Sequence, residues 1–145
     1  MKKFLSILML VFVAQLGLAQ NINTHPTVAK LIEKQGLREQ LAETKTGLND
    51  LILEDKKEDF SKKYDEIVNT FVDKFGKIIT KHFTEEQLQN IEKDIAEKGE
   101  AFNIGEHLPN DVDKFQEDLT ILQTEIGMEL QDLIMEYGNP DLFQE

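Results

Sequence analysis

The chain contains no cysteine, which removes several kinds of chemistry at once. Disulfides, thiolate metal sites, cysteine nucleophiles and the lipid-bearing cysteine of a bacterial lipoprotein are all excluded. Serine is scarce too, because beyond residue 19 only Ser61 remains, in a charged stretch without the glycines of a nucleophile elbow. There is no glycine-rich phosphate loop either. The sequence therefore predicts no catalytic residue and no cofactor site, and packing alone must hold the fold together.

Long apolar runs are missing except at the N-terminus. Two lysines precede an apolar run over residues 4–14, Gln15 ends it, and small residues occupy the third-last and last places before Gln20. This order is typical of a secretory signal peptide, and the run is shorter than the ~20 apolar residues of a membrane-spanning helix. We expect cleavage between Ala19 and Gln20, and a mature domain of residues 20–145 without a membrane span. Its expected location is the periplasm or the outside of the cell.

Basic residues are also few, with 16 lysines and arginines against 28 acidic residues and a net charge of −12. All the acidic residues follow Ala19 and two lysines precede it, so the mature balance is 14 − 28 = −14. Residues 99–145 hold 12 of the acids and a single basic residue, Lys114. Such a chain repels nucleic acid and anionic lipid headgroups. The acidic third is either an ordinary solvated surface or a docking surface for a cationic partner or divalent ions.

Proline occurs only three times, at Pro26, Pro109 and Pro140, and between these points the pattern is helical. Apolar residues recur at intervals of three and four, and no alternating β-branched run marks a half-buried strand. The sequence therefore predicts an all-α fold, a single-domain bundle of about five helices joined by short links. The mature length of 145 − 19 = 126 residues is enough for one core.

Local signals set the expected limits of the first three helices. The first helix is expected from Thr27 to a cap at Gly36, and the second over residues 37–52. The third helix follows a charged cluster at residues 56–59. It carries a continuous apolar stripe, formed by Phe60, Tyr64, Ile67, Phe71, Phe75, Ile78 and His82.

The clearest local signal marks the fourth helix. Thr84 followed three residues later by Gln87 is a capping box, so this helix is expected to begin at Glu85 and to run toward Phe102. The fifth helix is expected from residue 110 or 111, with an inner face of Val112, Phe115, Leu119, Leu122, Ile126, Leu130, Leu133 and Tyr137. Four further apolar residues widen this stripe: Ile121, Met128, Ile134 and Met135. A stripe of that width favours a helix that touches two or more neighbours.

Three histidines, His25, His82 and His107, stand beside turns or helix ends, and no two share a helical face. A zinc site needs three or four converging ligands, so His82 with Glu85 and Glu86 makes only part of one. The simpler interpretation of His82 is a half-buried residue at the negative end of a helix. The acids of residues 110–118 lack the glycine of a calcium loop and suit the opening of a helix instead. No metal is predicted.

Aromatic residues at helical spacing are most often part of a core, and this is the first interpretation of the phenylalanines. A second interpretation depends on their number. If some of these rings exceed what five helices can enclose, the surplus forms an exposed apolar groove for a partner helix or an apolar ligand. The residues concerned are Phe75, Phe83, Phe102 and Phe115.

Two stretches carry a family resemblance. Residues 65–102 contain Val72, Phe75, Ile78 and Ile79 running into Lys81-His82-Phe83-Thr84-Glu85-Glu86-Gln87-Leu88, and residues 28–36 read Val-Ala-Lys-Leu-Ile-Glu-Lys-Gln-Gly. They resemble the opening helix, aromatic turn and Thr-Glu-Glu-Leu-type cap of the bacterial family catalogued as domain of unknown function 2059. The resemblance implies an exported, all-helical protein of unassigned biochemistry and supplies no catalytic residue. After residue 95 the chain departs from that family, which continues with an aromatic pair and a short Pro/Gly segment.

Three functional hypotheses follow. The first is a non-enzymatic binding or interaction module for a protein partner or a small apolar ligand, and a homodimer through the fifth helix belongs to the same class. The second is an enzyme that uses carboxylates and His82, with or without a divalent ion. The third is an acidic chaperone-like adaptor in which residues 99–145 meet cationic clients.

Overall fold

The computed structural model describes residues 25–142, which form five α-helices. They are α2 (Pro26–Lys34), α3 (Leu37–Asn49), α4 (Lys57–His82), α5 (Glu85–Lys98) and α6 (Val112–Tyr137). Short 3₁₀ helices join or follow them: η1 (Glu54–Lys56), η2 (Gly99–Ala101), η3 (Ile104–Glu106) and η4 (Pro140–Leu142). The expected all-α bundle is confirmed, since the described range holds no strand, only an isolated bridge between Ile52 and Gly138. The expected cleavage between Ala19 and Gln20 lies outside this range.

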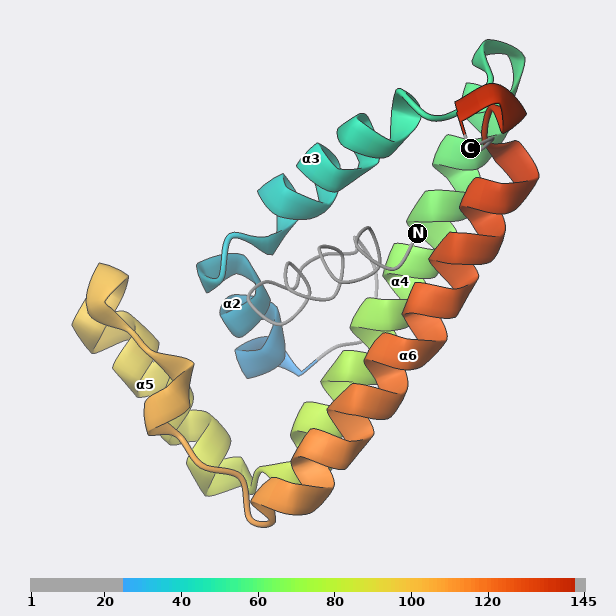
Figure 1. Ribbon diagram of the computed structural model, residues 1–145. Helices are drawn as coiled ribbons and strands as arrows, with labels where there is room; N and C mark the ends of the chain where they lie inside the picture. The colour runs from blue at the N-terminus through green and yellow to red at the C-terminus, as the bar shows by residue number, and fades with distance from the viewer. Residues whose placement is uncertain (1–24, 143–145) are drawn as a thin grey trace.

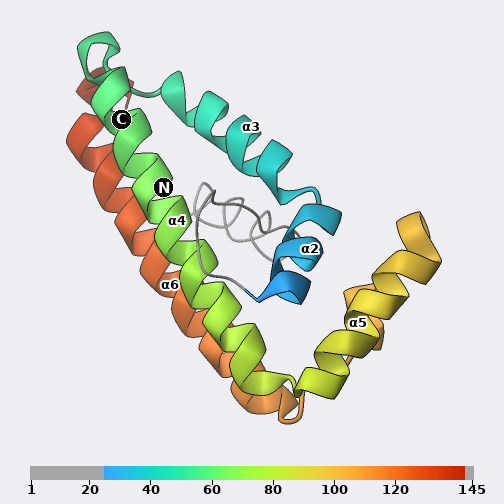
Figure 2. The same cartoon turned by 180° about the vertical axis from the view of Figure 1, so that it is seen from behind.

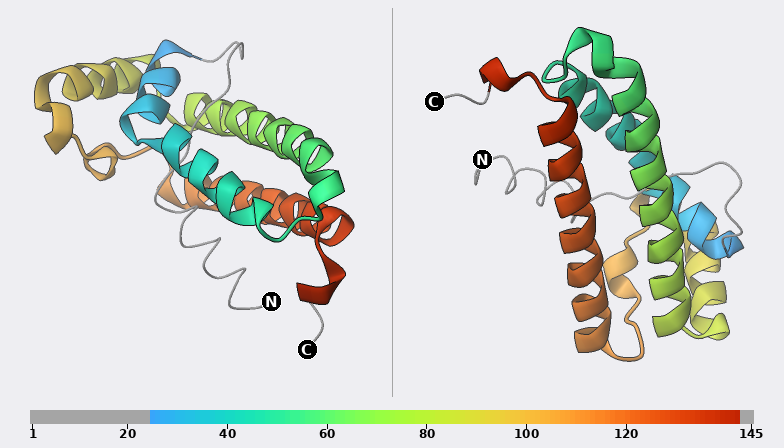
Figure 3. Two further views of the ribbon diagram at one scale, coloured as in Figure 1. Left: turned by 90° about the horizontal axis from the view of Figure 1, so that it is seen from above. Right: turned by 90° about the vertical axis from the view of Figure 1, so that its right-hand side faces the viewer.

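Helices α4 and α6 form a long antiparallel pair that sets the length of the molecule (Figure 1). Helix α3 runs back from the upper end of α4 toward α2, and α5 leaves the lower end of α4 at an angle and packs against α2. Figure 2 shows from behind that α2 lies between α3 and α5. In the side view of Figure 3 (right), α4 and α6 form a front layer with α2, α3 and α5 behind it. No other described helix covers the side of this layer that faces the viewer.

The helix ends follow the signals in the sequence. Oγ1 of Thr84 accepts a hydrogen bond from the backbone N–H of Gln87 (3.2 Å), and the backbone N–H of Thr84 donates to the Gln87 side chain (2.7 Å). This is the predicted capping box, which satisfies two otherwise unpaired donors at the start of α5. At the start of α6, Oδ1 of Asp111 accepts from the backbone N–H of Lys114 (3.1 Å). After α2, Gly36 adopts a φ of 65°, a left-handed conformation that glycine tolerates best.

One apolar core connects all five helices. Where α2 meets α5, Val28 and Ile91 are fully buried. Where α3 meets α4, the hydroxyl of Tyr64 donates to the carbonyl oxygen of Leu41 (3.1 Å), and burial raises the pKa of this tyrosine above its usual range. Helix α5 is therefore held by its packing on α2 as well as by its covalent link to α4.

Two expected C-terminal helix ends are wrong, and α4 begins at Lys57, inside the charged cluster that was expected to precede it. Leu51 and Ile52 lie beyond α3, and the carbonyl oxygen of Leu51 instead accepts a hydrogen bond from the backbone N–H of Asn139 (2.8 Å), just past α6. Phe102 lies beyond α5, which ends at Lys98 and is capped by Gly99 with a φ of 53°. Ile52 is nevertheless buried, and Leu51 and Phe102 pack against the core, because the turns that carry them fold onto it.

Candidate functional site

The outer face of α6 carries a row of large apolar side chains exposed to solvent. Ile121, Met128 and Met135 are 51%, 62% and 67% exposed. They are spaced seven residues apart, and seven residues are close to two helical turns, so the three side chains project from one side of the helix. We call these three residues the outer stripe.

The opposite face of α6 builds the core. Leu122, Ile126, Leu130 and Leu133 are buried there, and α4 packs along α6. The expectation that the widened stripe contacts two or more neighbours is therefore wrong for the three outer-stripe residues. Of the four widening residues only Ile134 packs against the core. The reason is that α2 packs on α5 rather than on α6. Among the described helices, only α4 therefore has an extensive contact with α6.

Acidic side chains line one edge of the outer stripe. Glu125, Glu129, Asp132 and Glu136 are exposed, and they follow one another at intervals of four, three and four residues, which keeps them on one side of the helix, beside the stripe. Glu125 forms an ion pair with Lys74 of α4 (2.7 Å). No ion pair among the described residues involves the other three acids of this edge. This edge, which we call the acidic edge, therefore presents three carboxylates without an ion-pair partner among the described residues, beside the paired Glu125.

The other edge of the stripe is uncharged. It carries Thr120, Thr124 and Gln131, and both threonine hydroxyls donate to backbone carbonyls one turn earlier, at 2.8 and 2.9 Å. The outer face of α6 is thus an apolar row with a negative side and a neutral side.

The four phenylalanines considered for a groove are not gathered at one surface. Phe75 and Phe83 are buried, whereas Phe102 and Phe115 are half-buried and pack against the core. Phe83 and Phe115 meet edge to face, with ring centroids 5.6 Å apart, but Phe102 stacks on His107 at 5.9 Å, in a different part of the chain. The large exposed apolar side chains of the described chain lie elsewhere, half of them on the outer stripe.

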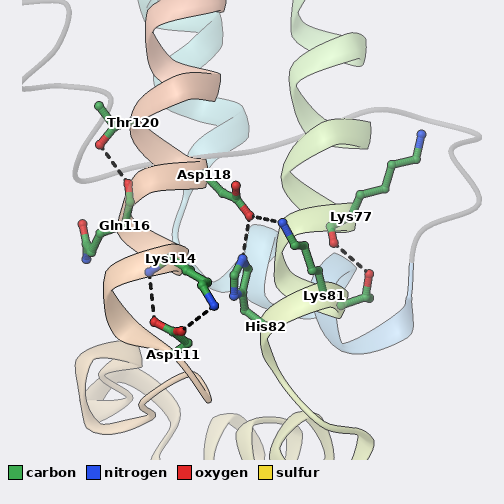
Figure 4. A network of polar contacts seen from close by, with 9 residues as sticks. Lys77, Lys81, His82, Asp111, Lys114, Gln116, Asp118 and Thr120 are labelled. Atoms are coloured by element: carbon green, nitrogen blue, oxygen red, sulfur yellow. Dashed lines mark hydrogen bonds and ion pairs between the residues drawn. The ribbon is translucent and has the colours of Figure 1, made fainter.

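A polar network ties the end of α4 to the start of α6. Figure 4 shows Lys81 and His82 both directed at Asp118. The Nε2 atom of His82 and the Nζ atom of Lys81 each lie 2.6 Å from Oδ2 of Asp118. The ring of Phe115 covers His82 edge to face at 5.5 Å. His82 is the last residue of α4, as expected, but it is buried rather than half-buried.

The contacts of this network fit a structural role, which is to hold α4 against α6, better than a catalytic one. Hydrogen bonds from His82 and Lys81 hold the pKa of Asp118 below its usual range. In the described part of the chain no hydroxyl group hydrogen-bonds to His82, so no nucleophile is paired with it. Glu85 contacts His25 (3.2 Å) instead of His82.

The third histidine makes a similar contact. Nε2 of His107 lies 2.8 Å from Oδ2 of Asp94, and Nζ of Lys98 lies 3.1 Å from the same oxygen. The hydrogen bond from His107, followed by that from Lys98, lowers the pKa of Asp94. Each of the three histidines thus contacts one carboxylate, which lies on another element than the histidine itself. Over residues 25–142, no three of the histidine and acidic side chains come together in a way that could hold a metal ion.

The lowered pKa values of Asp118 and Asp94 predict acid sensitivity. Each carboxyl has a folded pKa below its ordinary value of 3.8, so its contribution to stability is complete above that value and is lost as pH falls through the folded pKa. We expect the free energy of unfolding to drop as the pH falls below about 4, measured by urea denaturation at each pH. In Asp118→Asn this drop should be smaller, because the variant lacks one of the carboxyl groups whose protonation favours the unfolded state.

Asp132→Asn is the matched control for that measurement, since Asp132 is exposed and makes no ion pair among the described residues. It should keep the wild-type pH dependence. An Asp118→Asn variant with the same acid sensitivity as the wild type would show that the His82 contact does not stabilise the fold.

Comparisons with protein-family models, with curated proteins and with solved structures found no match to this chain. Membership in the domain of unknown function 2059 family therefore stays a prediction that rests on the resemblance of residues 28–36 and 65–102. In the part of the chain that the structure describes, no helix combines the length and the apolarity needed to cross a membrane.

Proposed function

We propose that this chain is an exported, non-enzymatic interaction module, and that the outer face of α6 binds a cationic amphipathic helix of another protein. The single observation that supports this proposal is the outer stripe of Ile121, Met128 and Met135 beside the acidic edge. Export follows from the signal peptide that the sequence predicts. Apolar side chains that recur at helical spacing along an exposed face are the anchors by which amphipathic helices dock on one another.

The shape of the stripe favours a helix as the partner. From Ile121 to Met135 it extends over 15 residues, or about 21 Å of helix, but it is only one side chain wide. A partner helix with apolar residues at intervals of three and four matches such a row over its whole length. Two of the three side chains are methionines, whose unbranched, polarisable chains adapt to differently shaped partners.

The charge of the face favours a cationic partner. Helix α6 carries seven acidic residues and one lysine, Lys114. Lysine or arginine beside the apolar residues of a partner would meet the acidic edge, accelerate encounter and fix orientation. A second copy of this chain that packed through the same face would bring a second acidic edge and net negative charge of its own. Electrostatic complementarity thus selects a basic partner over a homodimer.

Binding of a model peptide tests this function. The probe is a fluorescein-labelled amphipathic leucine–lysine peptide of about 18 residues, which forms about 27 Å of helix, and the readout is fluorescence anisotropy. The double variant Met128→Gln/Met135→Gln should weaken binding about tenfold or more, because two apolar anchors are lost. The triple variant Glu129→Gln/Asp132→Asn/Glu136→Gln should reduce the loss of affinity between about 50 and 500 mM salt.

Leu108→Gln is the matched control, because Leu108 is 67% exposed but lies outside α6. It should bind the peptide as the wild type does. Equal weakening by Leu108→Gln and by the double methionine variant would mean general hydrophobic adsorption and would contradict the proposal. Light scattering that shows a dimer broken by the methionine changes would assign the face to a second copy instead.

A further inference from the structure

All the sulfur in the described chain lies on the outer stripe. The sequence has four methionines and no cysteine. Two of the methionines, Met1 and Met9, belong to the expected signal peptide. The other two are Met128 and Met135, and the core residues beside them on α6 contain no sulfur. After cleavage at the expected site, the stripe would therefore hold every oxidisable sulfur atom of the protein.

Both of these sulfur-bearing side chains are open to solvent, at 62% for Met128 and 67% for Met135. Exposure matters because susceptibility of a sulfur to oxidation follows its access to the oxidant. No thiol is present to react first. The position of the two residues matters as well, because they supply two of the three apolar contacts of the proposed docking face.

We propose that Met128 and Met135 are a reversible oxidation site whose sulfoxide form releases the partner of α6. This inference rests on the proposed function. The oxidant is a peroxide, and the reaction is a two-electron oxygen transfer. The thioether sulfur attacks one peroxide oxygen, an S–O bond forms and the O–O bond breaks. With hydrogen peroxide, the sulfur is oxidised, the peroxide is reduced, and the proton on the transferred oxygen passes to the displaced hydroxide, which leaves as water.

The consequence for binding follows from polarity. A sulfoxide replaces an apolar thioether with a strongly polar group, so an oxidised stripe no longer matches the apolar row of a partner helix. The consequence for the fold should be small, because both side chains project away from the core formed by Leu122, Ile126 and Leu130. Oxidation would thus change what the protein binds without unfolding it. Methionine sulfoxide reductases reverse the modification.

The test uses the full chain, hydrogen peroxide and the leucine–lysine peptide. Trypsin leaves Met128 and Met135 on one fragment, because no lysine or arginine follows Lys114, and fragmentation mass spectrometry then locates each added oxygen. We expect both residues to gain one oxygen and peptide affinity to fall about tenfold. The thermal unfolding midpoint should stay unchanged, and treatment with methionine sulfoxide reductases should restore binding.

The control is Met128→Leu/Met135→Leu, which keeps an apolar stripe without sulfur. It should bind the peptide equally well before and after peroxide. If untreated wild-type protein does not bind, the proposed function fails. If untreated protein binds and the doubly oxidised protein binds equally well, the function stands and this inference is overturned. Loss of binding by the peroxide-treated leucine variant, or failure of peroxide to modify the two methionines, would also overturn it.

Discussion

Replacing Phe60 with alanine is expected to lower the free energy of unfolding by about 3–5 kcal/mol, measured by urea denaturation near neutral pH. Phe60 is fully buried in the first turns of α4. Its ring centroid lies 6.0 Å from that of Tyr64, whose hydroxyl bonds to Leu41 of α3. Truncation would remove the apolar contacts of the ring and leave a cavity at the place where α3 meets α4.

A half-buried phenylalanine provides the comparison for this prediction. Phe102 packs against the edge of the core after α5, so Phe102→Ala should cost roughly half as much as Phe60→Ala. If Phe60→Ala stays within about 1 kcal/mol of the wild type, the packing of α3 against α4 contributes little to stability. That result would contradict the position of Phe60 in the core.

The second large effect is expected at the joint between α2 and α5. Ile91 is fully buried there, and Ile91→Ala should cost about 2–5 kcal/mol. Because α5 packs mainly on α2, this loss should appear as local opening rather than as uniform destabilisation. Hydrogen exchange should therefore show reduced protection of amides in α2 and α5 while the amides of α4 and α6 keep theirs.

Ile121→Ala is the matched control, since it makes the same chemical change on the outer stripe, where the side chain is 51% exposed. It should change stability by no more than about 0.5 kcal/mol. Equal destabilisation by the two substitutions would mean that the outer face of α6 is packed in solution. Loss of protection in α4 and α6 along with α2 and α5 would mean that all four helices unfold together.

Most helix limits were predictable because their signals are local. The capping box at Thr84, the acid at Asp111 and the glycine at Gly36 act on backbone groups within four residues of themselves. The end of α5 also has a local signal, Gly99, whereas the end of α3 depends on a distant contact. The segment after α3 pairs with the chain after α6 through the hydrogen bond from Asn139 to Leu51. No residue pattern within α3 predicts that pairing.

The candidate site was less predictable than the fold. The apolar character and the spacing of Ile121, Met128 and Met135 were visible in the sequence, and so was the excess of acids. Their outward direction was not, because α6 has apolar residues on both of its sides and either side is able to face a neighbour. The sequence did contain one signal of the outward direction. The outer stripe has an apolar residue only every seven positions and acids beside it, whereas the core face of α6 has apolar residues every three or four positions and no charge.

The amino-acid sequence by itself determined the helical class, the approximate limits of the helices, the absence of thiol chemistry and the negative charge of the last third. These properties depend on composition, on periodicity and on contacts between near neighbours along the chain. Only the tertiary structure decided which face of α6 is buried against α4, and that His82 meets Asp118. Both depend on how residues far apart in the sequence pack together, and helical periodicity shows which residues share a face without showing what that face will meet.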